Sequence, residues 1–219
     1  MTVDESLIRT LRSLSTPTIS DAADRLAIVV QASAILRITG TGTVAGPAFT
    51  VQYVPVGTEG GTVGDYLDEV DTGAFVVLSN HGRLDATVWG GLLSELAARR
   101  EIAGTAVDGI CRDTPRAAAL DYPLFARARW MRTGKDRVRA QATQVPVVLG
   151  DLLVRPGDIV VGDDDGVVVL PKERVPEITE AAIAIEDAER AIREDTISGG
   201  MRLDEARAKH GYHSLQTKR

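Results

Sequence analysis

Residues 90–113 read GGLLSELAARREIAGTAVDGICRD, and this stretch decides the fold class. Its first half repeats apolar residues at helical spacing, which predicts a helix that begins at Gly90-Gly91 and ends by Gly104. Its second half, Thr105 to Ile110, has the apolar character of a buried strand. A helix that leads directly into a buried strand is typical of a βαβ unit, so the sequence predicts an α/β fold.

The segments before this stretch continue the alternation. Leucines at helical spacing predict a helix over residues 4–14. Thr16-Pro17 is then expected to interrupt the chain before a second helix that begins near Ser20-Asp21. The β-rich run 48–56 and the apolar run 74–78 predict strands, with a short helix leading to the second.

The C-terminal part predicts a compact β layer followed by a long helix. Residues 145–171 supply three short strands, with Pro156-Gly157 and Asp165-Gly166 as turn dipeptides. A stripe of apolar residues predicts one amphipathic helix from Pro171 to about Ser198, stopped by Gly199-Gly200. We therefore expect a single domain over residues 1–200 and a polar tail over residues 201–219.

Composition excludes several classes of protein. The chain has 219 residues, a formal net charge of −6 and 4% aromatic residues, which argues against a nucleic-acid partner. Cys111 is the only cysteine, cannot form an internal disulfide and favours a reducing compartment. No apolar leader and no run of about 18 apolar residues occurs, so we expect a cytoplasmic protein without a membrane partner.

Two neighbouring features could bind an anionic, metal-chelated substrate. The helix start at Gly90-Gly91-Leu92-Leu93 offers free backbone amides and the positive end of the helix dipole. Arg112 and Asp113 follow the predicted strand, and they offer a planar guanidinium for a carboxylate or keto oxygen and a hard oxygen for Mg²⁺. A tight loop and a surface ion pair are the structural alternatives for the same residues.

Other motifs favour structural roles. Asp163-Asp164-Asp165-Gly166 lies between valine-rich strands and is better explained as a hairpin turn than as a Ca²⁺ loop. His210 and His213 lie in the polar tail without a third ligand nearby, and Cys111 has no adjacent histidine base and is expected to be a small buried hydrophobe. Gly60-Gly61 with Thr62 and Gly64 lacks a Walker lysine and could instead border the active site.

Several motifs together resemble the RraA-like family. They are VDGICRD (107–113), WGGLLSELA (89–97), STPTISDAADRL (15–26), GPAFTVQ (46–52) and PGDIVVGDDDGVVVLP (156–171), the last followed by a Glu-rich helix. The resemblance runs from about Ser15 to Gly200. It implies a layered α/β/α fold similar to the swivelling phosphohistidine domain, with a central β-sandwich-like core and a long C-terminal helix, assembled as trimers or dimers of trimers.

The resemblance also implies roles for the residues singled out above. Asp113 matches the family's metal-binding aspartate for Mg²⁺ or Mn²⁺, and Arg112 matches its substrate-binding arginine. The segment Gly90 to Leu93 matches the backbone amides that hold the pyruvyl part of the substrate. Gly91 departs from the family's aldolases, which carry an aspartate there, so metal affinity or the base-assisted step is placed in doubt.

Two glutamates are further candidates under the resemblance. Glu95 lies one turn along the helix from Gly91 and could substitute for the missing carboxylate, or it could be a solvated helix residue. Glu189 looks like the family's helix glutamate, which could enter a neighbouring subunit's site. The structural alternative for Glu189 is an exposed ion pair with Arg193.

The implied activity is that of a class II pyruvate aldolase. Such a metal-dependent carbon–carbon lyase cleaves a 4-hydroxy-2-oxo acid such as 4-hydroxy-4-methyl-2-oxoglutarate to pyruvate, and it can also decarboxylate oxaloacetate. The partner is then a small anionic 2-oxo acid. Two alternatives stay open: a non-catalytic trimeric regulator of a ribonuclease, and a related lyase on a different hydroxy-oxo acid for which Gly91 widens the pocket.

Overall fold

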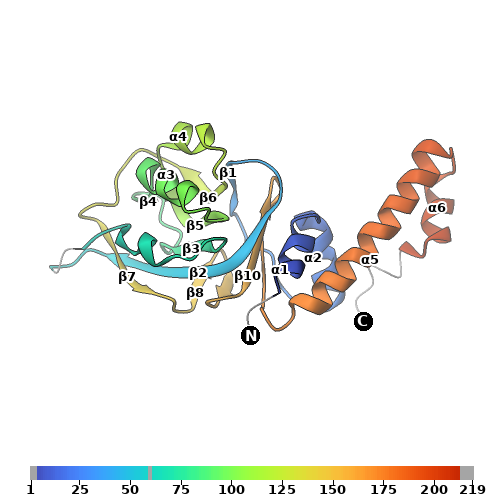
Figure 1. The fold of residues 1–219 in the computed structure, drawn as a ribbon, viewed down its shortest axis with the longest axis horizontal. Helices are drawn as coiled ribbons and strands as arrows, with labels where there is room; N and C mark the ends of the chain where they lie inside the picture. The colour runs from blue at the N-terminus through green and yellow to red at the C-terminus, as the bar shows by residue number, and fades with distance from the viewer. Residues whose placement is uncertain (1–3, 59–60, 213–219) are drawn as a thin grey trace.

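The computed structural model describes residues 4–58 and 61–212. Nine strands form one mixed sheet in the order β1-β6-β5-β3-β2-β10-β11, with β4 added beside β5 and β7 beside β2 (Figure 1). The strands of this sheet are β1 (Leu36–Thr39), β2 (Val44–Pro55), β3 (Phe75–Ser79), β4 (Thr87–Trp89), β5 (Gly104–Cys111), β6 (Leu124–Arg129), β7 (Val138–Thr143), β10 (Ile159–Asp163) and β11 (Gly166–Leu170). A separate hairpin pairs β8 (Val147–Leu149) with β9 (Leu152–Val154).

The helices lie outside this sheet. They are α1 (Glu5–Leu11), α2 (Thr16–Arg25), the 3-10 helix η1 (Asp65–Glu69), α3 (Gly91–Arg99), α4 (Thr114–Ala119), α5 (Val175–Arg193), the π-helical turn η2 (Glu194–Ser198) and α6 (Leu203–Lys209). In Figure 1, α3 and α4 lie beside β4, β5 and β6, whereas α1 and α2 lie between the sheet and α5. No helix in the described parts of the chain is both long and apolar enough to cross a membrane.

Parallel pairing forms the centre of the sheet. Strands β2, β3, β5 and β6 pair in parallel, and β4 pairs in parallel with β5. Every residue of β3 and β5 is buried, as expected for strands that are covered on both faces. This confirms the predicted α/β class and the βαβ unit, and it places the end of β5 next to the start of α3.

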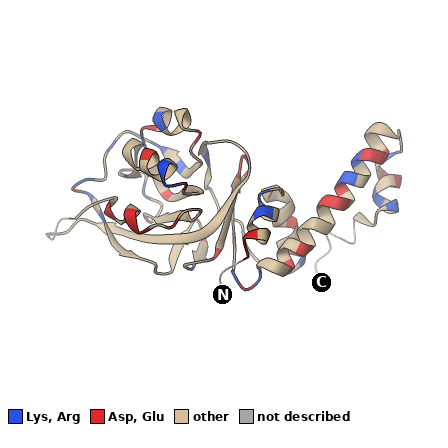
Figure 2. Cartoon of the chain, in the orientation of Figure 1, with Lys and Arg blue, Asp and Glu red and all other residues tan. Residues whose placement is uncertain are grey.

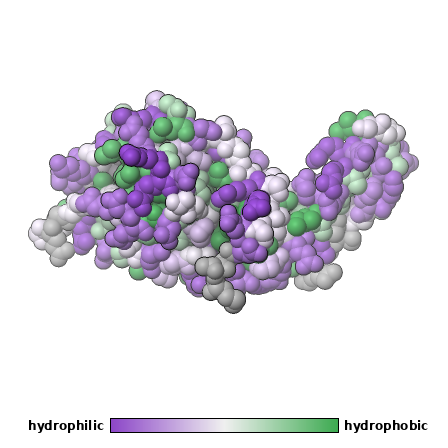
Figure 3. Space-filling model, viewed as in Figure 1, coloured by the Kyte–Doolittle hydropathy of each residue, from purple (hydrophilic) through white to green (hydrophobic). Residues whose placement is uncertain are grey.

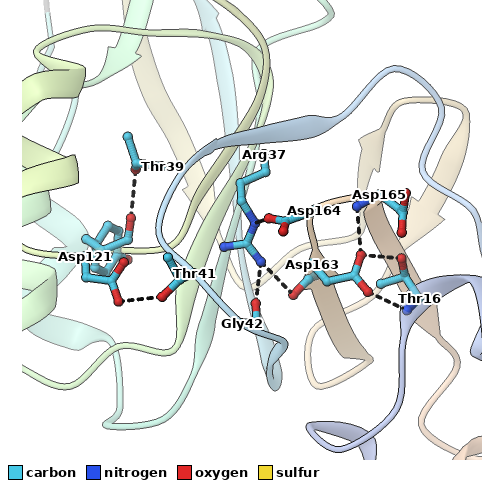
Figure 4. Close-up of polar contacts among 11 residues, drawn as sticks. Thr16, Arg37, Thr39, Thr41, Gly42, Asp121, Asp163, Asp164 and Asp165 are labelled. Carbon is cyan, nitrogen blue, oxygen red and sulfur yellow. Dashed lines mark hydrogen bonds and ion pairs between the residues drawn. The ribbon is translucent and has the colours of Figure 1, made fainter.

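The sheet curves until its two ends nearly meet. Arg37 of β1 forms an ion pair with Asp164 in the β10–β11 turn, at 2.7 Å from Nε to Oδ1. Its Nη2 also lies 3.5 Å from the carbonyl oxygen of Gly162 in β10 (Figure 4). The Arg37 guanidinium stacks over the Phe125 ring, 4.9 Å from its centroid. One arginine therefore bridges the seam of a barrel-like sheet.

Asp163 fastens α2 to the same seam. Its carboxylate accepts hydrogen bonds from the Thr16 backbone amide at 2.7 Å and from the Thr16 hydroxyl at 2.6 Å. It also accepts one from the Asp165 amide at 3.0 Å, within the hairpin turn (Figure 4). The acidic run is thus a structural turn and helix anchor, as the sequence favoured.

Three apolar clusters hold the fold together. The first fills the barrel-like interior and includes Phe75, Phe125, Val160 and Val169. The second lies between the sheet and the helices α3 and η1, and it includes Trp89, Tyr122 and Leu67. The third lies between β10, β11 and the helices α1, α2 and α5, and it includes Leu11, Ile19, Ile159, Ile178 and Ile185. Burial of these side chains on both faces of the sheet is the main source of stability.

Three expectations need correction. The β-sandwich-like core is instead one continuous sheet, because the long strand β2 pairs with β10 at its start and with β3 and β7 further along. Thr16-Pro17 begins α2 rather than interrupting the chain, since proline is tolerated in the first turn of a helix. Residues 145–171 form four strands, not three. The predicted polar tail is not contradicted, and part of it forms the short helix α6.

The predicted long C-terminal helix is confirmed, and its outer part extends away from the sheet. Helix α5 continues through η2, and α6 folds back beside them (Figure 1). Asp195 of η2 pairs with Lys209 Nζ at 2.8 Å and with His210 Nε2 at 2.7 Å, and both contacts lower the pKa of the Asp195 carboxyl group. Acidic and basic residues are interspersed along the outer part of these helices (Figure 2), and hydrophilic residues cover most of the visible arm (Figure 3).

Gly162 gives a test of how closely the barrel-like interior is packed. A Cβ atom at this position would lie 2.6 Å from Cζ of Phe125, so Gly162→Ala should overpack the interior. We expect a loss of about 1–3 kcal/mol in the free energy of unfolding, measured by urea denaturation. Gly57→Ala is the matched control, because a Cβ atom at Gly57 meets no atom within 4 Å. Equal stability of the two variants would contradict the close contact between β6 and β10.

Candidate functional site

A cavity of about 590 Å³ lies where α3 begins and where β5 ends. Every predicted site residue lines it: Gly90, Gly91, Leu92, Leu93, Arg112 and Asp113. Two segments 20 residues apart along the chain therefore face one space, because β5 returns the chain to the end of β4. The structure brings the predicted residues together, and the role of each stays a prediction.

The start of α3 presents backbone amides to this cavity. The Gly91 N–H donates to Oδ2 of Asp113 at 3.0 Å, so the carboxylate caps the first turn of the helix. Among the described residues, the amides of Leu92 and Leu93 have no hydrogen-bond acceptor. Both lie at the positive end of the helix dipole and are available to an anionic ligand.

Buried side chains fix the backbone at this helix start. The Trp89 indole N–H donates to the Ser94 hydroxyl at 2.9 Å, and that hydroxyl donates to the Gly90 carbonyl at 3.2 Å. Trp89 also stacks on Tyr122, with 6.1 Å between the ring centroids. Because Trp89 and Ser94 are both buried, the Gly90 backbone is held in place before any ligand arrives.

Arg112 and Asp113 occupy the carboxyl end of β5, and both remain accessible. The Arg112 side chain is 39% exposed and that of Asp113 is 51% exposed, with 3.6 Å between Nε and Oδ2. Asp113 has a left-handed φ of 56°, an uncommon backbone conformation for a residue other than glycine. A Cβ atom at Gly90 would lie 3.0 Å from Asp113 Oδ2, so a side chain there would crowd the carboxylate.

The opposite wall of the cavity combines expected and unexpected residues. Gly61, Thr62 and Gly64 line it, as the glycine-rich segment suggested, whereas Gly60 lies outside the described residues. Five further polar residues line the cavity without a signal in the sequence: Asp65, Asp68, Thr87, Thr133 and Lys135. Thr133 and Lys135 reach the site because a β-bridge joins Thr87 to Thr133, and no local motif signals that pairing.

Comparison with known proteins gives the chain a family. The model of the RraA-like family, described as Aldolase/RraA, matches residues 16–169. The chain belongs to the RraA-like family.

Two relatives illustrate the range of this RraA-like family. Protein DlpA of Legionella pneumophila is 35% identical over 210 residues, which is 94% of this chain but only 34% of DlpA. The chain therefore spans about a third of that relative's length. A Halalkalibacterium halodurans protein named "Putative 4-hydroxy-4-methyl-2-oxoglutarate aldolase" is 32% identical and covers 80% of this chain and 81% of its own.

Solved structures agree with this RraA-like assignment. An uncharacterized protein from Pseudomonas syringae pv. tomato is 38% identical, with a TM-score of 0.88 over 94% of this chain and 99% of its own. Streptomyces coelicolor RraAS2 is described as an unusual member of the RNase ES inhibitor RraA protein family. It is 31% identical, with a TM-score of 0.79 over 87% of this chain and 96% of its own.

The two glutamates suggested by the RraA-like resemblance have other partners here. Glu95 forms an ion pair with Arg116 of α4. Glu189 accepts a hydrogen bond from the Tyr212 hydroxyl at 2.7 Å, on the arm formed by α5 and the C-terminal segment. Neither residue lines the cavity beside Asp113. Of the two histidines near the C-terminal end of the sequence, His210 pairs with Asp195, and His213 lies outside the described residues.

The donor set of this RraA-like site fits a hydrated hard cation. No group of three or more His, Cys, Asp or Glu side chains gathers as a metal cluster within residues 4–58 and 61–212. The Asp113 side chain is half exposed. Among these residues both contacts of its carboxylate, with Arg112 Nε and the Gly91 amide, are made at Oδ2, which leaves Oδ1 available. Mg²⁺ commonly keeps several waters and binds one or two carboxylates together with its substrate. The cavity offers the carboxylate of Asp113, with those of Asp65 and Asp68 elsewhere on its wall, which suits that mode. The described part of its lining holds no His or Cys and therefore does not suit a tetrahedral zinc site.

Cys111 is adjacent to Arg112 but does not share its exposure. The thiol is fully buried in β5, and this burial raises its pKa to about 12. The structure therefore confirms the expected role of a small buried hydrophobe in this RraA-like chain.

Thiol alkylation tests the burial of Cys111. At pH 8 a thiol with this pKa has only about one thiolate in 10⁴ molecules, so folded protein should resist iodoacetamide. The same protein unfolded in about 6 M guanidinium should react fully, as followed by mass spectrometry. Rapid labelling of the folded protein would contradict the buried position.

Proposed function

We propose that this protein is a divalent-metal-dependent carbon–carbon lyase that releases pyruvate from a 4-hydroxy-2-oxo acid. One observation carries the proposal: an arginine, two free helix amides and an accessible carboxylate converge on a single cavity. Membership of a family that is described as Aldolase/RraA supports the reaction class. A substrate such as 4-hydroxy-4-methyl-2-oxoglutarate belongs to the proposal, as the name of the Halalkalibacterium relative suggests.

The protein's groups match the pyruvyl part of such a substrate. The amides of Leu92 and Leu93 would donate hydrogen bonds to the carboxylate at C1, and the Arg112 guanidinium would contact the keto oxygen at C2. When the C3–C4 bond breaks, its electron pair moves toward the C2 oxygen and forms an enolate. Arg112 and the helix dipole stabilise that developing charge more than they stabilise the ground state.

Asp113 would hold Mg²⁺ or Mn²⁺ in this proposal. The cation, when bound, would polarise the 2-keto oxygen as a Lewis acid. Cleavage also requires loss of the 4-hydroxyl proton to a water or a carboxylate, and Asp65 and Asp68 are the other carboxylates on the cavity wall. The enolate then takes a proton at C3 to give pyruvate, and the second fragment leaves as a carbonyl compound. Oxaloacetate decarboxylation forms the same enolate and is an expected side activity.

The first test replaces the proposed cation ligand. A lactate-dehydrogenase-coupled assay with 4-hydroxy-4-methyl-2-oxoglutarate or oxaloacetate should detect pyruvate only when Mg²⁺ or Mn²⁺ is present. Asp113→Asn should lower kcat by more than about 100-fold, because the neutral amide holds a hard cation poorly. Asp85→Asn is the control, since Asp85 is an exposed carboxylate paired with Arg83 away from the cavity. Metal-independent turnover, or full activity of Asp113→Asn, would refute the lyase proposal.

The second test concerns Arg112. Arg112→Met removes the guanidinium and keeps an apolar stem, so it should lower kcat/KM for oxaloacetate by roughly 10- to 100-fold, as expected for the loss of hydrogen bonds to a charged ligand. Arg83→Met, which removes an exposed arginine that does not line the cavity, should leave kcat/KM near that of the unchanged protein. A loss that is equal in the two variants would argue against a substrate contact by Arg112.

A ribonuclease regulator is the second candidate function. The likeness to RraAS2, described as a member of the RNase ES inhibitor RraA protein family, favours it. The trimer or dimer of trimers implied by the family resemblance is part of either proposal, and native mass spectrometry would measure it. Metal-dependent pyruvate release separates the two functions, because a non-catalytic regulator would release no pyruvate.

A further inference from the structure

The side chain of Arg116 fills the space beside Gly91. A Cβ atom at Gly91 would lie 2.9 Å from Cδ of Arg116 and 3.2 Å from Cβ of Asp113. Position 91 therefore touches both the proposed cation ligand and an arginine. The missing side chain does not widen the cavity in this direction, because the arginine stem already occupies the space.

Arg116 is held where it contacts Gly91. Its backbone N–H donates to the Asp113 carbonyl at 3.0 Å within the first turn of α4, and its guanidinium pairs with Glu95 of α3. The Arg116 side chain is 62% exposed, and an exposed ion pair of this kind contributes less than about 1 kcal/mol to stability. The main consequence of the ion pair with Glu95 is therefore local, because it keeps the positively charged guanidinium of Arg116 next to the start of α3.

The charge on Arg116 determines what a side chain at position 91 could do. A carboxylate there would extend from a point in contact with Asp113, and two adjacent carboxylates bind a divalent cation more tightly than one. The same carboxylate would also meet Arg116, which would pair with it and cancel its charge. The effect of a substitution at position 91 must therefore depend on the residue at position 116.

We propose that Gly91 and Arg116 are coupled in their effect on the cation site at Asp113: the charge of Arg116 prevents a carboxylate at position 91 from raising the cation affinity. With this pair the start of α3 offers the carboxylate of Asp113 alone, while Asp65 and Asp68 lie elsewhere on the cavity wall. The site therefore holds the cation weakly and leaves its other positions to water and to the oxygens of an anionic ligand. The inference rests on the proposed function only in taking Asp113 as the cation ligand.

Mn²⁺ binding to the substrate-free protein tests the coupling. The affinity is measured by electron paramagnetic resonance for the unchanged protein, Gly91→Asp, Arg116→Met and the double variant. Methionine keeps the stem of Arg116 and removes its charge, so the two Gly91→Asp proteins are crowded alike. Each single variant should bind within about threefold of the unchanged protein, and the double variant should bind about tenfold more tightly or better, the scale seen for residues that support a metal ligand.

Two controls separate charge from other effects. Gly91→Asp combined with Arg116→Lys keeps the positive charge and should bind Mn²⁺ like the unchanged protein. Arg190→Met removes the arginine of another exposed ion pair, Arg190 with Asp187 on α5, and should change nothing. Thermal melting of each variant shows that it is folded.

Several results would overturn the coupling. They are a tenfold gain from Gly91→Asp alone, additive effects of the two substitutions, an equal gain with Arg116→Lys, or no Mn²⁺ binding by the double variant. Failure of the lyase proposal would give a different set of results. Coupled Mn²⁺ binding without any pyruvate release would support the pair and refute the catalytic function.

Discussion

The hydrogen bond from the Gly91 amide to the Asp113 carboxylate is the contact on which the site depends. It joins the first turn of α3 to the residue that follows β5, although 22 residues separate the two groups along the chain. The contact needs β4 and β5 to be parallel neighbours, so that the chain passes through α3 and returns to the same edge of the sheet. It also needs the left-handed backbone of Asp113, which turns the carboxylate toward α3. This hydrogen bond therefore depends both on the local backbone conformation of Asp113 and on the order of the strands in the sheet.

Much of this arrangement follows from contiguous sequence. The helix start at Gly90, the buried strand β5 and the polar pair at its end lie within one stretch, and each has a local signal. On the opposite wall, Thr133 and Lys135 have no such signal, because they reach the cavity only through the bridge between Thr87 and Thr133. The contact of Gly91 with Arg116 could not be predicted either. It depends on the left-handed backbone conformation of Asp113, which no residue pattern encodes.

Long-range contacts also explain why parts of the fold differ from the prediction. Thr16-Pro17 carries a breaker signal, yet the buried carboxylate of Asp163, far along the chain, accepts hydrogen bonds from Thr16 and fixes it as a helix start. The family resemblance implied a β-sandwich-like core. Strand β2 is long enough to pair with β10 and with β3 and β7, and only its tertiary partners show this. Short-range patterns predicted the elements, and long-range pairing determined how they join.

The shared strand β2 has a consequence for how the protein unfolds. Its N-terminal part contributes Ala45 to the cluster packed under α1, α2 and α5, whereas Val51 and Tyr53 belong to the cluster beside α3 and η1. Loss of β2 from either half would remove a central partner from the other and leave open strand edges on both sides. The two halves therefore cannot melt independently, and the helix arm side and the cavity side form one cooperative unit.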